Sequence, residues 1–379
     1  MAADNDISAI IAMSDLSSSK GDYGRSLLLL RNALNQIEKS TSGDLKQRLD
    51  ILMKLADVNH ITGQWVDALM YLDNAFHTAS ENKLNGVMIE ILLASGTILS
   101  KKGKWDIALR KFDQAISLMG SAAHQSLMAR ALVGKGVISW RKGAGPEAIQ
   151  YAKKAMSMVA EKDREDIMGS AQALIATAAF DMGDYDLSLK SNDKAFAHFQ
   201  GAGNQMEMTR VLNNTGETYK LMGDYARAKE FFTQGLSLSG GSSPRSAAYL
   251  LTNIAECHAR QGQNTDARTF IHMADEKAQG VQDDYLHSML KFVWALIHES
   301  ENDHEKAAEQ YLSAMSKMRS MSIPFDTGMI QMAYARFLFK QSKADEASKQ
   351  MEDAVTSFRK AGSQLLLELA EAELAKFNN

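Results

Sequence analysis

Residues 223–236 decide the fold of this chain, and they read Gly-Asp-Tyr-Ala-Arg-Ala-Lys-Glu-Phe-Phe-Thr-Gln-Gly-Leu. Gly223 can take the left-handed backbone conformation that ends one helix, and Asp224 can cap the start of the next. Apolar side chains recur at helical spacing both before the glycine, in residues 211–221, and after it, in residues 225–236. The stretch therefore predicts two amphipathic helices joined by a very short turn.

The same turn recurs about every 40 residues along the chain. We call the residues that mark it the anchors, and they are Gly21, Gly63, Gly103, Gly143, Gly183, Gly223, Gly262, Asn302 and Ser342. At seven residues before, five after and twelve after each anchor, the sequence always has Ala, Gly or Ser. Small residues at fixed places let two helices approach closely and let each pair nest on the next. A period in this range indicates a stacked array of helix pairs.

The pattern sets the extent of the array. We expect an all-α protein, an α-α superhelix of about nine helix–turn–helix repeats over residues 7–359. Residues 362–377 again have leucines at helical spacing, but no second helix follows, so this segment is expected to be a helix that caps the last pair. Because no linker or low-complexity tract interrupts the pattern, residues 1–379 are expected to form a single domain.

The stretch 223–236 resembles the tetratricopeptide repeat, and the resemblance extends over essentially the whole array. The strict consensus unit has about 34 residues. A 40-residue unit is instead similar to the longer-helix subclass of Leu-Gly-Asn repeat proteins, kinesin light chains and bacterial Rap regulators. The proline that usually closes each unit is missing here, which the long connections between repeats explain. The resemblance implies a right-handed solenoid whose first helices line a concave groove for a partner peptide or helix.

Composition limits the possible partners and the compartment. The net charge of −4 argues against nucleic acid as a partner, because nucleic-acid-binding surfaces usually show a basic excess. The single cysteine, Cys257, permits no internal disulfide and suits a reducing compartment. The polar start lacks the pattern of a signal peptide, and no apolar run is long enough to span a bilayer. We expect a cytoplasmic protein that neither inserts into membranes nor binds nucleic acid.

The motifs of catalysis are absent from the sequence. There is no glycine-rich phosphate loop, no Cys-x-x-Cys, no His-Glu-x-x-His and no nucleophile elbow. His258 and His298 occupy equivalent places in neighbouring repeats, but no third metal ligand accompanies them. A structural or solvated role is favoured for both. We therefore predict no catalytic residue, no metal and no cofactor.

Ligand contacts in tetratricopeptide arrays come from a fixed subset of first-helix positions, which the resemblance transfers to this chain. The predicted partner-binding residues are Arg130, Trp140, Phe180, Arg210, Asn213, Asn214, Glu217, Tyr249, Asn253, Glu256, Phe292, Arg336 and Phe339. The asparagine amides carry both a donor and an acceptor, so they can pair with a peptide main chain whatever its sequence. The aromatic residues would supply apolar anchors, and the arginines could bind carboxylates of an acidic ligand.

Two alternatives stay open for these polar residues. The asparagines could bond one another or solvent between repeats, and the arginines could form ion pairs within a repeat. The lysine–asparagine carboxylate clamp of chaperone-tail binders is not present in the N-terminal repeats. Its matching positions hold Met53, Asp57, Leu93, Thr97, Val133 and Val137.

The function expected from the sequence is that of a non-enzymatic adaptor, which binds a partner segment along the groove of repeats four to nine. The alternative is a Rap-like regulator in which a short peptide tightens the superhelix. Rap-type proteins carry a distinct N-terminal helical bundle, whereas this chain begins repeating near residue 7, which favours the adaptor. An enzyme built on a repeat scaffold is the third alternative, and the lack of any additional domain counts against it.

Overall fold

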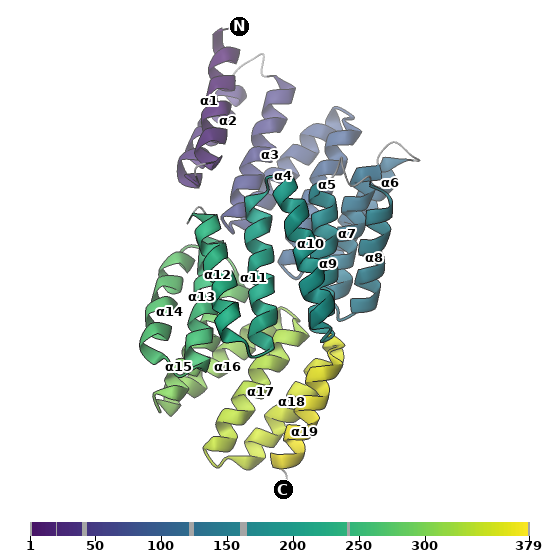
Figure 1. The fold of residues 1–379 in the computed structure, drawn as a ribbon. Helices are drawn as coiled ribbons and strands as arrows, with labels where there is room; N and C mark the ends of the chain where they lie inside the picture. The colour runs from purple at the N-terminus through teal and green to yellow at the C-terminus, as the bar shows by residue number, and fades with distance from the viewer. Residues whose placement is uncertain are drawn as a thin grey trace. The chain divides into compact units, whose positions relative to one another are not determined.

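The computed structural model describes residues 2–19, 21–39, 44–120, 125–159, 165–240 and 243–377. Within these ranges the chain forms nineteen α-helices and no β-strand (Figure 1). The first helices of successive pairs are α1 (Ala2–Ser19), α3 (Leu45–Ile61), α5 (Asn85–Lys101), α7 (Gln125–Arg141), α9 (Glu165–Asp181), α11 (Gln205–Leu221), α13 (Pro244–Arg260), α15 (Asp284–Ser300) and α17 (Pro324–Lys340).

The second helices complete nine antiparallel pairs. They are α2 (Tyr23–Lys39), α4 (Trp65–Glu81), α6 (Trp105–Met119), α8 (Gly145–Ser157), α10 (Tyr185–Gly201), α12 (Tyr225–Ser239), α14 (Asn264–Ala278), α16 (His304–Ser320) and α18 (Ala344–Ala361). One further helix, α19 (Gln364–Phe377), packs on α18 through Leu366 and Ala370, which are buried. The prediction of nine repeats with a capping helix is confirmed, although α1 begins earlier than the expected residue 7.

The anchors explain the turns within the pairs. All nine have positive φ, from 61° at Ser342 to 84° at Gly183. Glycine takes this left-handed conformation without steric cost, and Asn302 and Ser342 take it in the last two repeats. After the turn, Asp224 Oδ1 accepts a hydrogen bond of 3.0 Å from the backbone N–H of Arg227. The predicted cap of the second helix is thus confirmed.

The small residues at the three fixed positions are buried in every repeat. Those five residues after each anchor are at most 1% exposed. Ala228, for example, packs with Phe232, Leu250 and Ile254 in one apolar cluster. Close packing of helices through small side chains therefore repeats along the chain.

This packing gives a testable expectation for Ala228. Replacing it with Leu should overpack the contact between α11 and α12 and lower the free energy of unfolding by about 1–3 kcal/mol. Glu230→Leu, at an exposed position of the same helix, serves as the control and should leave the free energy of unfolding nearly unchanged. Chemical denaturation measures both. Equal stability of Ala228→Leu and the native protein would contradict the assigned packing.

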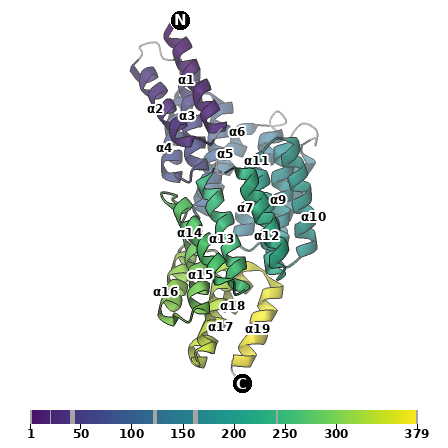
Figure 2. The same cartoon turned by 60° about the vertical axis from the view of Figure 1, so that its left-hand side comes forward.

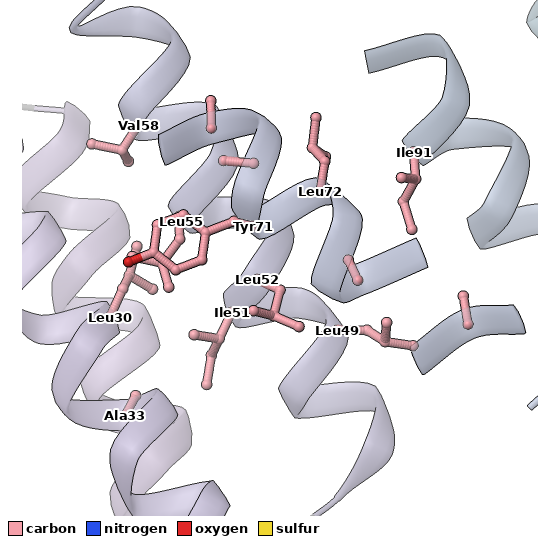
Figure 3. Packing of buried hydrophobic residues seen from close by; sticks show 14 of the residues in the cluster. Leu30, Ala33, Leu49, Ile51, Leu52, Leu55, Val58, Tyr71, Leu72 and Ile91 are labelled. Carbon is pink, nitrogen blue, oxygen red and sulfur yellow. The ribbon is translucent and has the colours of Figure 1, made fainter. Parts of the chain in front are cut away.

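The helices group into two compact units. Unit 1 comprises residues 1–134, 240–245 and 280–282, and unit 2 comprises residues 135–239, 246–279 and 283–379. In unit 1, Leu30, Leu52, Leu55 and Leu72 form the centre of a core shared by the first two repeats (Figure 3). The expectation of a single domain over residues 1–379 stays a prediction.

Within unit 2, repeat nine returns to contact repeats four and five. The ring of Phe180 at the end of α9 lies 5.5 Å from that of Phe325 at the start of α17. The turn at Gly143 lies against the backbone carbonyl of Lys360, so closely that a Cβ atom at Gly143 would collide with it. Both views show α19 beside the lower ends of α9 and α10 (Figures 1 and 2). We call this contact the seam of unit 2.

Candidate partner-binding face and its ionic cluster

The first helices of unit 2 carry a group of charged residues that we call the ionic cluster: Arg141, Asp181, Glu217, Lys220, Glu256, Arg260 and Asp326. Each of the helices α7, α9, α11, α13 and α17 supplies at least one member. Residues one turn apart on a helix share a face, so Glu217 and Lys220 on α11, like Glu256 and Arg260 on α13, are neighbours.

Lys220 is the centre of the cluster. Its Nζ donates to Glu256 Oε2 at 2.6 Å and to Asn253 Oδ1 at 3.1 Å, and lies 2.9 Å from Glu217 Oε2. The Lys220 side chain is only 10% exposed. Burial opposes its charge, but the carboxylates of Glu217 and Glu256 outweigh burial and raise the pKa of Lys220. The ammonium group thus stays charged and joins α11 to α13.

The pKa values of the two glutamates around Lys220 shift in opposite directions. Glu256 is 3% exposed, and Arg260 Nε donates to its Oε1 at 2.8 Å. Burial alone would favour the neutral acid, but Lys220 and Arg260 lower the pKa of Glu256 to about 2. Among the residues that the structure describes, no arginine pairs with Glu217, and burial raises its pKa although Lys220 acts in the opposite direction. Glu217 is 28% exposed, more than either Lys220 or Glu256.

The predicted asparagines divide into a paired and an unpaired set. Asn253 is 4% exposed, and its Nδ2 donates to Asn213 Oδ1 at 2.9 Å. The alternative that these amides bond one another between repeats is therefore correct for this pair, and Asn253 is not an open position on a groove wall. Asn214 is half-buried, and its side chain forms no hydrogen bond with any other residue that the structure describes.

A second part of the ionic cluster lies at the seam. Trp140 Nε1 donates to Asp181 Oδ2 at 2.6 Å, and the guanidinium of Arg141 lies 4.1 Å from the centre of the Trp140 ring. The Tyr285 hydroxyl donates to Asp326 Oδ1 at 3.2 Å. Burial, together with the charge of Asp326, raises the pKa of Asp181 to about 8. The predicted anchor Trp140 thus acts as a hydrogen-bond donor within the protein.

Sequence reasoning did not select Asp181, Tyr285 or Asp326. One signal was available for Asp181, because the position two residues before the anchor is charged in four repeats of unit 2, as Arg141, Asp181, Arg260 and Lys340. No periodic signal exists for Asp326. It joins the cluster only because the seam brings the start of α17 to the end of α9.

Several other predicted residues are engaged inside the protein. Phe292 is 2% exposed and packs against Tyr311 in a core cluster, so the expectation of a groove anchor is corrected by its burial. Phe180 packs on Phe325, and Phe339, although 42% exposed, stacks on Phe377 at 4.3 Å. First-helix register therefore does not by itself place an aromatic ring on an open face.

The remaining predicted residues keep polar partners or solvent contact. Arg210 is exposed and pairs with Glu207 on its own helix at 2.7 Å, as the ion-pair alternative predicts. Arg336 donates to Glu373 of the capping helix at 2.8 Å. The Tyr249 hydroxyl donates to Asp283 at 2.9 Å. Arg130 belongs to unit 1, where its side chain is exposed.

The two candidate histidines are packed on aromatic rings. His258 stacks on Phe270 at 5.3 Å, and His298 stacks on Trp294 at 5.6 Å. Among the described residues, no three His, Cys, Asp or Glu side chains come together as ligands for a metal ion. None of the helices described has the length and apolar character that crossing a membrane requires.

Comparisons with known proteins identify the class. Models of the tetratricopeptide repeat match residues 93–160 and 168–239, which hold parts of repeats three to six. Together with the nine helix pairs, these matches show that the chain is a tetratricopeptide repeat protein.

Individual relatives are distant. Outer dynein arm-docking complex subunit 4 of Xenopus laevis is 24% identical over 121 residues, which make up 32% of this chain and 22% of that protein. Among solved structures, a Rap protein complexed with competence and sporulation factor has a TM-score of 0.64 at 12% identity, over 98% of this chain and 99% of its own. The Rap conjugation regulator of plasmid pLS20, in complex with the Phr* peptide, has a TM-score of 0.60 at 12% identity, over 98% of this chain and 97% of its own. These likenesses establish the fold.

Proposed function

We propose that this protein is a non-enzymatic scaffold that binds a segment of another protein along the first helices of unit 2, with α11 at the centre of the contact. The observation that carries the proposal is the half-buried amide of Asn214, which has no hydrogen-bond partner within the described part of the chain. Solvent reaches this amide, and an accessible donor and acceptor on a helix can bind the main chain of a ligand.

The surroundings of Asn214 support a pre-formed site. Lys220 fixes α11 to α13 through Glu256 and Asn253, and Asn213 is held by Asn253. A site on helices that are already fixed loses little conformational entropy when a ligand binds. Asn213 retains its Nδ2 donor and Glu217 a partly exposed carboxyl group, so the face offers neighbouring polar groups of both kinds.

The second candidate function is regulation by a short peptide. Unit 2 closes on itself through a seam between repeat nine and repeats four and five, and a ligand that binds the first helices could strengthen or weaken that seam. Two similar structures, the Rap protein and the pLS20 regulator, are complexes with competence and sporulation factor and with the Phr* peptide. This candidate shares the binding face of the scaffold and differs from it by a change in shape.

Site-specific photocrosslinking tests the binding face. A photoreactive amino acid at position 214 of α11 should capture a protein from extracts of the native host, whereas the same residue at the exposed Thr233 of α12 should not. Mass spectrometry identifies the captured protein, which is then purified for calorimetry. Equal capture at both positions, or capture at Thr233 alone, would count against the inner face.

Two single substitutions then separate binding from stability. Asn214→Ala should lower the affinity for the purified partner about two- to tenfold, because one hydrogen bond worth about 0.5–1.5 kcal/mol is lost. The melting temperature should not change. Asn253→Ala removes two internal hydrogen bonds and should instead lower the free energy of unfolding by about 1–3 kcal/mol. Calorimetry and a melting curve distinguish them. A stability loss for Asn214→Ala with unchanged affinity would contradict the proposal.

A further inference from the structure

We propose that α19 is a dimerisation helix, whose exposed face is covered by the α19 of a second copy of this chain in an antiparallel pair with a two-fold axis at Ala372. Dimerisation goes beyond the proposed function, because the occupant of this face is a second copy of the chain and not another protein. The register of α19, the exposure of its side chains and its charges carry the proposal.

The repeat register shows which face of α19 lacks a covering helix. In α17 the corresponding face packs against α18, the second helix of the same pair. Phe325, Met332 and Ala335 share a core cluster with residues of α18, and a Cβ built on Gly328 would collide with the ring of Phe358. All four of these α17 residues are buried. Since α19 begins at Gln364, 40 residues after Pro324, the equivalent positions on α19 are Leu365, Glu368, Ala372 and Ala375.

All four equivalent positions are exposed on α19. Leu365 is 47% exposed although it touches the turn at Gly183, and Leu369, one turn further along the helix, is 42% exposed. Leu366 and Ala370, which pack on α18, are buried. In both views α19 lies at an edge of unit 2, beside α18 (Figures 1 and 2). Among the described helices, none covers on α19 the strip that α17 buries within its own pair.

The charges of α19 favour a second copy as the occupant. Two of its four charged side chains are neutralised within the chain, because Glu371 pairs with Arg359 of α18 at 3.3 Å and Glu373 accepts from Arg336 of α17 at 2.8 Å. The other two are Glu368 and Lys376. Glu368 accepts from Gln364 of its own helix, and neither forms an ion pair with any residue that the structure describes. They have opposite signs and lie four residues before and four after Ala372.

A two-fold axis at Ala372 makes this face complementary to itself. In an antiparallel pair with that axis, residues equally far before and after Ala372 lie level with each other. Glu368 of one copy then lies level with Lys376 of the second copy, and the reciprocal pair forms at the other end. The small side chain of Ala372 meets itself at the axis and lets the helices approach. Symmetric dimers require a surface patch that matches itself in this way.

The expected dimer is weak. A helix of 14 residues is about 21 Å long, so two of them bury less than the roughly 1,200 Å² at the lower end of standard-size interfaces. Binding on this scale leaves little surplus over the entropy lost on association. We therefore expect a reversible dimer with a dissociation constant in the micromolar range.

Sedimentation velocity of the full chain tests the assembly. The sedimentation coefficient should rise from the monomer value towards the dimer value between about 1 and about 300 μM. Leu369→Glu places a carboxylate in the contact and should stay monomeric with unchanged helical content. Leu312→Glu is the matched control, because Leu312 of α16 is 51% exposed, and it should assemble like the parent chain. A parent chain that stays monomeric, or a Leu369→Glu variant that assembles equally well, would overturn the proposal.

A charge exchange tests the antiparallel pairing. Glu368→Lys or Lys376→Glu alone should weaken the dimer about three- to thirtyfold, because two pairs per dimer change from attraction to repulsion. The double variant with both substitutions restores opposite charges at each pair. It should recover the affinity of the parent chain to within about threefold. A double variant that is weaker than both single variants would contradict the pairing of Glu368 with Lys376.

A cysteine at the axis locates the contact. Ala372→Cys in a Cys257→Ser background should form a disulfide-linked dimer under mild oxidation, because the axis places this residue opposite itself within disulfide reach. Thr233→Cys, at an exposed position of α12, is the control and should stay largely monomeric. Equal crosslinking at the two positions would show that α19 does not lie at a two-fold axis. If a different protein covers α19, both purified variants stay monomeric, which overturns the dimer and leaves the scaffold function standing.

Discussion

Lys220→Met is expected to lower the free energy of unfolding by about 3–5 kcal/mol. The substitution removes the cation from a buried group and leaves Glu256, at 3% exposure, with Arg260 as its remaining charged partner. Breaking a buried pair by removing one member is costly because the other charge stays desolvated. The stem of methionine fills much of the lysine volume, so the loss reports the charge and not a cavity. Urea denaturation at pH 7 measures it.

Two companion variants make this result specific. Lys306→Met removes a lysine that is 62% exposed and pairs with Asp303 at 2.7 Å, so it should change stability by less than about 1 kcal/mol. Adding Glu256→Gln to Lys220→Met should restore part of the loss, because the uncompensated carboxylate is gone. A Lys220→Met protein as stable as Lys306→Met would mean that the group is solvated and not a structural link between α11 and α13.

The same variant has a pH signature. In the native protein the pKa of Glu256 is about 2, below its ordinary value of 4.5, so its pairing stabilises the fold above pH 4.5 and the stabilisation is lost as the pH falls from 4.5 towards 2. Lys220→Met removes the largest favourable partner of Glu256. The difference in stability between the native protein and the variant should therefore shrink as the pH falls from 5 to 3.

The fold could be predicted from the sequence because every repeat has to meet the same two local structural requirements. The left-handed turn needs a residue that tolerates positive φ, and the close helix contact needs small side chains, so both constraints appear at fixed positions. Even Asn302 and Ser342, which replace the anchor glycine, were placed correctly by register alone. Local constraints of this kind recur with the period and are visible in one sequence.

The candidate site was only partly predictable, for a related physical reason. Register brings residues of adjacent repeats together, and the bond between Asn213 and Asn253 is such a contact. It does not reveal contacts between repeats that are distant along the chain, so Asp326 and its effect on Asp181 were missed. Register also does not fix the depth of a side chain, and Phe292, expected on a groove wall, lies in the core with Tyr311.

One covariation that register reasoning overlooked concerns the small position before the anchor. At two of the three glycines in this position, Gly96 and Gly216, the facing helix carries a phenylalanine, Phe112 or Phe232, whose ring occupies the space of the absent Cβ. At the third, Gly136, the equivalent residue of the facing helix is Ala152. The repeat after that of Gly216 has Ala255 there and the smaller Ile271 opposite it. In the repeats of Gly96 and Gly216, a methyl group absent on one helix is thus replaced by an aromatic ring from the other.

Phe232→Ala is accordingly expected to lower the free energy of unfolding by about 3–5 kcal/mol. The ring is 0% exposed and lies among Leu250, Ile254 and Cys257, so its removal leaves a cavity at the centre of the apolar cluster. Phe231→Ala is the matched control on the same helix. Its ring is partly exposed and stacks on Tyr219 at 5.4 Å, so the loss should be clearly smaller. Equal losses would contradict the assigned orientation of α12.

Whether a second substitution at this contact, Gly216→Ala, stabilises or destabilises the protein should depend on the Phe232 ring. In the native protein, Gly216→Ala places a Cβ 2.5 Å from Phe232 Cε1, which forces a shift and should cost about 1–3 kcal/mol. In the Phe232→Ala background that collision is gone, and alanine is favoured over glycine within a helix by about 1 kcal/mol. Gly216→Ala should then stabilise the protein. Denaturation of all four members of this double-mutant cycle measures the coupling, and a Gly216→Ala effect of the same sign in both backgrounds would show that the ring does not fill the space above the glycine.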